Sequence, residues 1–169
     1  MPEQPEFRVD ALLHSLTAHG VDFVVIGGIA ATLLGSVRDT FDLDICPSND
    51  PGNLKSLGDA LTELGARLRG VDEALPFVAD DRTLGHVEVL TLETRHGALD
   101  VLMRPDGCPP YPQLRRRAER KDLGSFSVLV ASIGDLIAMK DAAGRPKDMV
   151  VVEDLKAVRQ LRKRLGIAD

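Results

Sequence analysis

Two aspartates stand one residue apart in an apolar segment, Phe41-Asp42-Leu43-Asp44-Ile45. If this segment is a β-strand, Asp42 and Asp44 project from the same face, because side chains alternate between the two faces of a strand. Carboxylates that close repel each other unless a proton or a cation lies between them. Oxygen ligands on a rigid strand suit Mg²⁺, which prefers a few carboxylates together with substrate phosphates. The pair therefore predicts a metal-dependent phosphoryl-transfer site.

A third aspartate, Asp100, lies inside the otherwise apolar segment 98–102. Aspartate is disfavoured in strand interiors, and burying it without a partner is costly. If this segment lies beside the strand 41–46, three carboxylates meet at one point. Such a set can hold two metal ions, of which one activates the attacking oxygen and the other stabilises the leaving pyrophosphate.

A double glycine, Gly27-Gly28, follows the apolar segment 21–26. Between a strand and a helix it would let the backbone approach a phosphate, next to the free N–H groups of the helix N-terminus. Arg38 and Thr40 come shortly before the aspartates, and a guanidinium there could bind phosphate oxygens. Taken singly, the glycines suit an ordinary tight turn and the aspartates a solvated edge strand. Together, and in this order, they favour a nucleotide site.

These features resemble a known family, the DNA polymerase β-like nucleotidyltransferase superfamily. The most similar subgroup is the minimal bacterial nucleotidyltransferases, which include the abortive-infection toxin type. The motifs are Gly27-Gly28-Ile29-Ala30, Arg38-x-Thr40-x-Asp42-x-Asp44 and the later Asp100. The tail segments 132–140 and 144–148 are also similar to that subgroup, so the resemblance covers about residues 9–160.

The resemblance implies a reaction in which a nucleoside triphosphate binds with Mg²⁺ and an acceptor hydroxyl attacks its α-phosphate, so that pyrophosphate leaves. Asp42 and Asp44 would hold the metals, and Asp100 would complete the catalytic metal site and help to deprotonate the acceptor. Gly27 and Gly28 would contact the β- and γ-phosphates. The sequence has no Gly-x4-Gly-Lys-Ser/Thr motif, so this is not a P-loop.

The acceptor stays open at this stage. Many relatives have His-Gly where this chain has Leu34-Gly35, and little of the chain follows Asp100. A tRNA end, a partner protein and a small molecule such as an antibiotic are all candidates, within a toxin–antitoxin or abortive-infection system. The alternative function is a catalytically silent nucleotide-binding or protein-interaction module of a toxin–antitoxin pair.

Further polar residues have two interpretations each. Lys140 and Lys147 could reach a triphosphate, or they could be surface charges on helices. Asp148 is expected to serve the start of the last helix. The basic run 115–117, with nearby basic residues at 120 and 121, is expected to be a solvated helix face, with RNA phosphate binding as the alternative.

The remaining candidates are expected to be structural. Cys46 would be a small buried hydrophobe. His86 and Glu88 would share a polar face of a strand. Cys46 and Cys108 lack metal-ligand spacing and do not suggest a disulfide framework, so we expect a cytoplasmic protein.

Hydrophobic periodicity and helix stop signals predict an α/β (α+β) fold, a nucleotidyltransferase-type mixed β-sheet flanked by helices. The expected helices are 8–19, 29–34, 53–64, 114–119, 133–143 and 147–165, and the expected strands are 21–26, 41–46, 87–92, 99–103 and 126–130, with 70–83 as a loop or short irregular strand. We expect a nucleotidyltransferase core at 1–130 and a short helical C-terminal segment at 131–169, packed together as one compact domain.

Composition and charge are those of an ordinary globular chain of 169 residues. Five Phe, one Tyr and no Trp argue against base stacking as the main mode of binding. Residues 1–99 carry excess acid and residues 100–169 carry excess base, which suggests either two differently solvated surfaces or a basic wall that faces the acidic site. No apolar run reaches 18 residues, so no membrane partner is expected.

Overall fold

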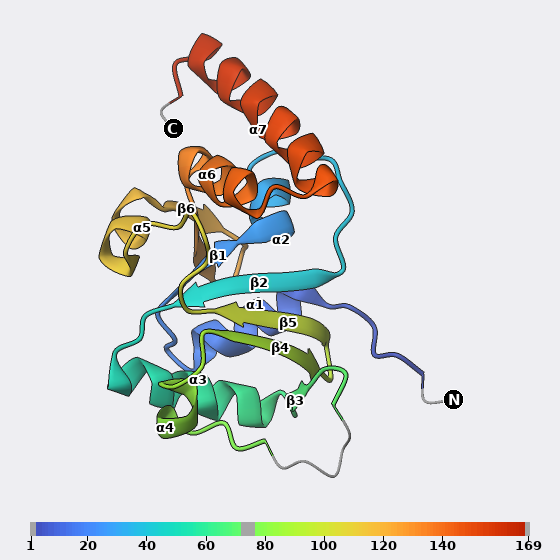
Figure 1. Cartoon of the computed structure of the whole chain (residues 1–169), viewed down its shortest axis with the longest axis vertical. Coiled ribbons are helices and arrows are strands. Elements are labelled where there is room, and N and C mark those ends of the chain that lie inside the picture. The colour runs from blue at the N-terminus through green and yellow to red at the C-terminus, as the bar shows by residue number, and fades with distance from the viewer. Residues whose placement is uncertain (1–2, 72–76, 168–169) are drawn as a thin grey trace.

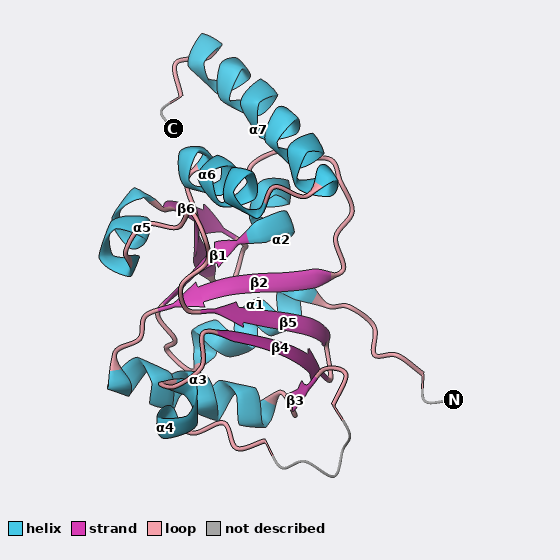
Figure 2. Ribbon diagram, viewed as in Figure 1, coloured by secondary structure: helices cyan, strands magenta, loops and turns pink. Residues whose placement is uncertain are grey.

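The computed structural model of the chain describes residues 3–71 and 77–167. Within these residues the strands form one seven-stranded mixed sheet in the order β3-β4-β5-β2-β1-β7-β6 (Figure 2). The strands are β1 (Phe23–Ile26), β2 (Asp42–Pro47), β3 (Arg67–Leu68), β4 (Val89–Thr94), β5 (Gly97–Leu102), β6 (Glu119–Asp122) and β7 (Ser127–Val130). The helices are α1 (Val9–Ala18), α2 (Gly27–Leu33), α3 (Pro51–Glu63), α4 (Asp81–Leu84), α5 (Tyr111–Arg117), α6 (Ile133–Ala143) and α7 (Pro146–Arg164).

The two faces of the sheet have different coverings. On β2, Leu43 and Ile45 are fully buried, and α1, which contacts α3, packs against this strand. The alternate residues, Asp42 and Asp44, project from the opposite face, where α2 contacts β1 and β2. Helix α2 in turn contacts α6, and α6 contacts α7, so that these helices lie together at one end of the molecule (Figure 1). The acidic residues of β2 therefore look toward the α2–α6–α7 side.

The predicted fold class and most predicted elements are confirmed. Helix α6 begins with Ser132 as its N-cap, whose Oγ accepts a hydrogen bond from the Asp135 N–H at 3.1 Å. It ends at Gly144, which adopts the left-handed conformation that favours glycine at a helix end. Apolar periodicity predicts these helices because each buries one face.

Other expectations are wrong in detail. Gly27 and Gly28 do not form a separate turn before the helix: they are its first residues, directly after β1. The expected helix 114–119 lies at Tyr111–Arg117, and Glu119–Asp122 is a strand, since it pairs with β7. Part of the expected loop 70–83 is the short helix α4, and residues 72–76 lie outside the described residues. None of the described helices is long and apolar enough to cross a membrane.

Asn53, in α3, forms hydrogen bonds with the backbone next to β1 and β2. Its Nδ2 donates to the backbone oxygens of Asp22 at 2.9 Å and Ser48 at 2.8 Å, and its Oδ1 accepts from the Asp22 N–H at 2.7 Å. Asp22 immediately precedes β1 and Ser48 immediately follows β2. One side chain therefore holds together the end of the central antiparallel pair at which β1 begins and β2 ends.

We expect Asn53→Ala to lower the free energy of unfolding by roughly 1–3 kcal/mol, because the substitution leaves partly buried backbone groups without a partner. Urea unfolding followed by circular dichroism measures the change. Ser56→Ala is the matched control, because the Ser56 hydroxyl donates an exposed hydrogen bond to the Gly52 oxygen of the same helix. Equal stabilities for the two variants would contradict this role of Asn53.

Candidate active site

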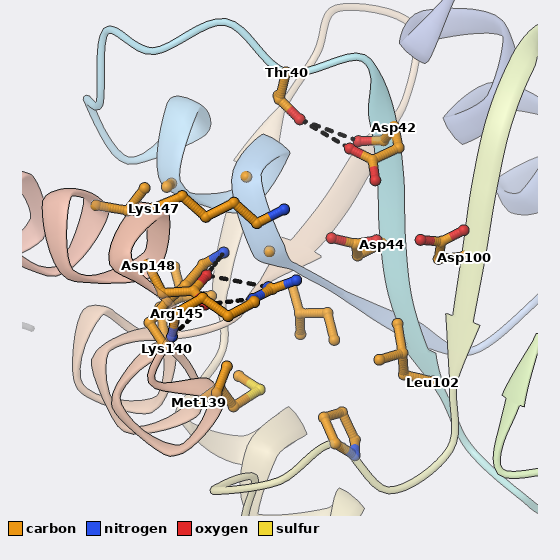
Figure 3. A pocket seen from close by; sticks show the side chains of 18 of the residues that line it. Thr40, Asp42, Asp44, Asp100, Leu102, Met139, Lys140, Arg145, Lys147 and Asp148 are labelled. Atoms are coloured by element: carbon orange, nitrogen blue, oxygen red, sulfur yellow. Dashed lines mark hydrogen bonds and ion pairs between the residues drawn. The ribbon is translucent and has the colours of Figure 1, made fainter. Parts of the chain in front are cut away.

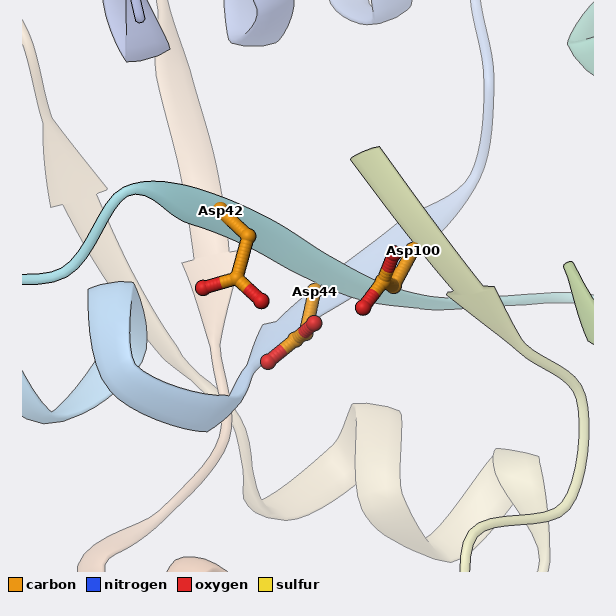
Figure 4. A group of neighbouring side chains, drawn as sticks. All are labelled: Asp42, Asp44 and Asp100. Carbon is orange, nitrogen blue, oxygen red and sulfur yellow. The ribbon is translucent and has the colours of Figure 1, made fainter. Parts of the chain in front are cut away.

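Strand register brings the three predicted aspartates together. Strands β2 and β5 pair in parallel, and Asp44 lies opposite Asp100. Asp42 is two residues earlier on β2 and shares the face of Asp44. Each of the three side chains offers a carboxylate oxygen, and these oxygens lie within 4.8 Å of one another (Figure 4).

Nearby cations compensate the negative charge of the cluster only in part. Burial, together with the charges of Asp42 and Asp100, raises the pKa of Asp44 to about 7. Burial also raises the pKa of Asp100, although the Arg69 guanidinium opposes this shift. A divalent cation would remove the repulsion, and three hard oxygen donors at this spacing are the ligand chemistry that Mg²⁺ takes. The residues present therefore fit a divalent metal.

The double glycine leaves space for this cluster. Gly27 has φ +70°, and a Cβ there would overlap the Asp44 carboxylate, with its Cγ only 2.9 Å away. A Cβ on Gly28 would lie 2.9 Å from the Oγ1 of Thr40. That hydroxyl donates to the Asp42 Oδ1 at 3.2 Å. The positive φ and the contact with Asp44 favour glycine at position 27, and the close contact with Thr40 favours it at position 28.

Basic side chains form the opposite wall. Asp148 is 1% exposed and accepts hydrogen bonds from the Lys140 Nζ at 3.3 Å and the Arg145 Nε at 2.6 Å. The Arg145 hydrogen bonds hold the pKa of Asp148 below its usual range. Asp148 also accepts from the Arg145 backbone N–H, so it caps α7 as the sequence predicts. Lys147, by contrast, reaches across the cavity toward β2 (Figure 3).

The two walls enclose a cavity of about 880 Å³, a size that suits a small-molecule ligand. Its apolar lining includes Leu102, Pro105, Leu136 and Met139. The cavity lies between the acidic strand residues on one side and the α6–α7 junction on the other (Figure 3). The net charge therefore changes sign from one wall to the other.

All of the predicted site residues line this cavity, although their functional roles stay predictions. They are Gly27, Gly28, Arg38, Thr40, Asp42, Asp44, Asp100, Lys140 and Lys147. Arg38 forms an ion pair with α7, since its Nε donates a hydrogen bond to the Asp154 Oδ2 at 2.7 Å. In the described part of the chain no acidic side chain pairs with Lys147.

Sequence reasoning missed two cations of the site. Arg145 lies in a segment already noted for its resemblance, but its pairing with a buried carboxylate needs the folded helix junction. Arg69 follows a strand that the sequence does not predict. It donates to the Asp100 Oδ1 at 2.8 Å, a contact between residues 31 positions apart that no local pattern signals.

The other candidates are not among the residues that line the cavity. Cys46 is 1% exposed, as predicted for a small hydrophobe. His86 and Glu88 precede β4 rather than sharing a face of it, which corrects the expected strand boundary. Two arginines of the basic run join α5 to the rest of the fold by ion pairs. Arg115 pairs with Asp22 at 3.0 Å and Arg117 pairs with Asp135 at 2.8 Å.

No protein-family model and no curated protein matches this chain. Solved structures do show the same fold. The lincomycin-bound crystal structure of the lincosamide antibiotic adenylyltransferase LnuA is 15% identical, with a TM-score of 0.60 over 90% of this chain and 99% of that one. The crystal structure of ANT(2″)-Ia in complex with adenylyl-2″-tobramycin is 17% identical, with a TM-score of 0.54 over 92% of this chain and 93% of that one. The fold is therefore that of these nucleotidyltransferases.

In EDTA, we expect the stability of Asp44→Asn, relative to that of the wild type, to increase as the pH rises from 4 to 7. Above pH 7 this difference in stability should stay constant. The pKa of Asp44 in the folded protein, about 7, exceeds the ordinary aspartate value of 3.8. The folded protein therefore binds more protons than the unfolded chain in this window, and its stability falls as the pH rises. Asn carries no charge and escapes this loss.

Thermal unfolding of both proteins between pH 4 and pH 8 measures this difference in stability. Asp59→Asn, at an exposed position of α3, is the control and should show no such trend. A stability difference between Asp44→Asn and the wild type that is constant with pH, or that shifts in favour of the wild type as the pH rises, would contradict the raised pKa of Asp44.

Proposed function

We propose that this protein is a Mg²⁺-dependent nucleotidyltransferase that transfers a nucleoside monophosphate from a nucleoside triphosphate to an acceptor hydroxyl. One observation carries the proposal: three carboxylates within 4.8 Å of one another face a basic wall across one cavity. The acidic side suits metal ions and the basic side suits a polyphosphate. The fold shared with two antibiotic adenylyltransferases supports the same chemistry.

Asp42, Asp44 and Asp100 would hold the metal. When bound, Mg²⁺ would polarise the phosphate to be attacked and would neutralise the charge that develops on the pyrophosphate. The raised pKa of Asp44 supports this assignment, because a bound cation would relieve the repulsion that causes part of the shift. Strand β2 is rigid and central, which suits ligands that must keep a fixed spacing.

Lys147 is the best candidate for a direct contact with the triphosphate, because its side chain extends into the cavity toward β2 (Figure 3). Lys140 and Arg145 share Asp148, so two cations face the cavity with one carboxylate between them. Their remaining N–H groups could donate to phosphate oxygens. Gly27 and Gly28 would let the phosphates approach the backbone at the other side of the cavity.

In the proposed reaction the acceptor oxygen forms a bond to the α-phosphorus and the bond to the β-phosphate oxygen breaks. Pyrophosphate leaves, and the proton of the acceptor hydroxyl passes to a carboxylate. Asp100 is the candidate for that base, since burial raises its pKa and its side chain lines the cavity.

A small hydroxylated molecule is the acceptor that the cavity favours. Among the residues that line the cavity, Phe41 is 74% exposed and Val89 is 55% exposed, and Leu102 lies opposite Val89 in the pairing of β4 with β5. An apolar rim of this kind suits a compact ligand better than a nucleic acid backbone, which needs rows of cations. The structures of LnuA with bound lincomycin and of ANT(2″)-Ia in complex with adenylyl-2″-tobramycin add weight to this choice. A tRNA end and a partner protein remain the other acceptors to test.

A toxin role with an antitoxin partner rests on the sequence resemblance alone. It predicts that an intact carboxylate cluster is needed for growth inhibition when the gene is expressed. The silent-module alternative predicts nucleotide binding without pyrophosphate release. The enzyme proposal predicts both binding and release, so the experiment below separates it from the silent module.

We expect ATP, GTP, CTP or UTP with Mg²⁺ to raise the unfolding temperature of the wild type, but not that of Asp42→Asn/Asp44→Asn. Ligand binding to the native state stabilises it by about 2.7 kcal/mol at a hundred times the Kd. The double variant lacks two of the three metal ligands. Thermal shift with and without Mg²⁺, followed by pyrophosphate release with a panel of hydroxylated small molecules, measures both steps.

The control is Asp59→Asn, which should behave as the wild type in both measurements. Stabilisation of the double variant equal to that of the wild type would contradict the metal assignment. Metal-dependent binding without pyrophosphate release from small molecules, tRNA or cell-extract acceptors would favour the silent module.

We expect Lys147→Ala to raise the Kd for the nucleoside triphosphate about 10- to 100-fold, which corresponds to the loss of a charge-assisted hydrogen bond of roughly 1.5–3 kcal/mol. Isothermal titration calorimetry with Mg²⁺ and a non-hydrolysable triphosphate analogue measures the Kd. Lys156→Ala removes the same charge from an exposed position of α7 and should leave the Kd unchanged. Equal affinities for the two variants would place the triphosphate away from Lys147.

A further inference from the structure

Arg69 is fixed next to the metal-site carboxylates by the edge of the sheet. Its backbone N–H donates to the Thr91 oxygen at 2.9 Å, which continues the pairing of β3 with β4. Its side-chain Nη2 donates to the Leu92 oxygen at 2.9 Å and to the Asp100 Oδ1 at 2.8 Å. The guanidinium therefore bridges a backbone carbonyl of β4 and a carboxylate of β5.

A weaker contact completes this arrangement. The Arg69 Nε lies 3.8 Å from the Glu93 Oε2, so a second acid borders the same guanidinium. The Asp100 side chain is 17% exposed and that of Arg69 is 37% exposed, which makes the pair partly shielded from water. Shielding strengthens a charge-assisted hydrogen bond relative to an ordinary surface ion pair.

We propose that Arg69 is a positioning residue: it fixes the orientation of the Asp100 carboxylate so that its remaining lone pairs face the metal site formed with Asp42 and Asp44. The inference rests on the proposed function, because it assumes a metal at this cluster. A carboxylate has about four acceptor positions, so one hydrogen bond from Arg69 leaves others for a cation. Figure 4 shows the Asp100 side chain directed from β5 toward Asp44.

Orientation by hydrogen-bonded neighbours is how proteins commonly keep metal ligands in place. Asp100 needs such a neighbour more than Asp42 and Asp44 do, because it is the member of the cluster that lies on a different strand. Asp44 and Asp100 would otherwise turn apart to reduce their repulsion. Arg69 offsets that tendency from the side of Asp100 that faces β4.

The competing explanation is that Arg69 is only a counter-charge. The two explanations predict opposite changes in metal affinity. Removal of a positive charge beside a cation site should tighten cation binding by Coulomb's law. Loss of the group that orients a ligand should weaken it, typically by about 10- to 100-fold for a hydrogen-bonded neighbour of a metal ligand.

The experiment is titration of the full chain with Mn²⁺ alone, with free Mn²⁺ counted by electron paramagnetic resonance. Arg69→Ala should bind Mn²⁺ about 10-fold more weakly than the wild type or worse. Arg69→Lys keeps the charge and one donor and should recover part of that loss. Arg116→Ala removes the same charge from an exposed position of α5 and should bind as the wild type. Thermal unfolding in EDTA checks that each variant is folded.

Unchanged or tighter Mn²⁺ binding by folded Arg69→Ala would overturn the positioning role, and so would a failure of Arg69→Lys to bind better than Arg69→Ala. If Arg69→Ala does not fold, Arg69→Lys alone decides: weaker binding than the wild type supports the role and equal binding overturns it. Asp100→Asn tests the underlying metal site. Weak binding by Asp100→Asn with normal binding by Arg69→Ala would reject only the role of Arg69, whereas no Mn²⁺ binding by the wild type would reject the metal site itself.

Discussion

The parallel pairing of β2 with β5 is the constraint on which the site depends. It places Asp44 opposite Asp100, and the period of the strand then places Asp42 on the same face. Like charges this close are unfavourable, and the rest of the sheet keeps them together. Leu43 and Ile45 anchor the other face of β2 in the core with no exposed surface, so the strand cannot slip by one residue without burying its acids. The packing of one face thus enforces electrostatic strain on the other.

The neighbouring elements respond to that strain in two ways. On the strand side the Arg69 guanidinium contacts Asp100, while Asp44 keeps a pKa raised to about 7. On the helix side, the α6–α7 junction carries cations, but its carboxylate Asp148 binds two of them. Compensation is therefore partial and is divided between two walls. A metal ion and a polyanion that bind together would complete it, which is the electrostatic reason for proposing a metal–nucleotide complex as the ligand.

The sequence predicts the acidic cluster because the signal is local. An aspartate between apolar residues of a strand has few structural explanations. Three such aspartates make a functional cluster the simplest one. Glu119–Asp122 is the opposite case: four consecutive charged residues carry no strand pattern, and they form β6 only because β7 supplies a partner. Arg69 was missed for the same reason. The position of Arg69 depends on pairing with β4, more than twenty residues further along the chain. The local hydrophobic pattern does not predict such a pairing.

Ion pairs help to join the basic wall to the rest of the fold. Arg38, in the segment that leads to β2, lies 2.7 Å from Asp154 on α7, and Arg162 near the end of the helix lies 2.7 Å from Glu119 on β6. Two buried apolar residues, Val152 and Leu155, add the hydrophobic part of the contact. The Arg38 pair joins the residues just before Asp42 to the helix that carries Lys147. The acidic and basic walls are therefore coupled through the segment that precedes Asp42. The position of Lys147 relative to the three carboxylates depends on this segment.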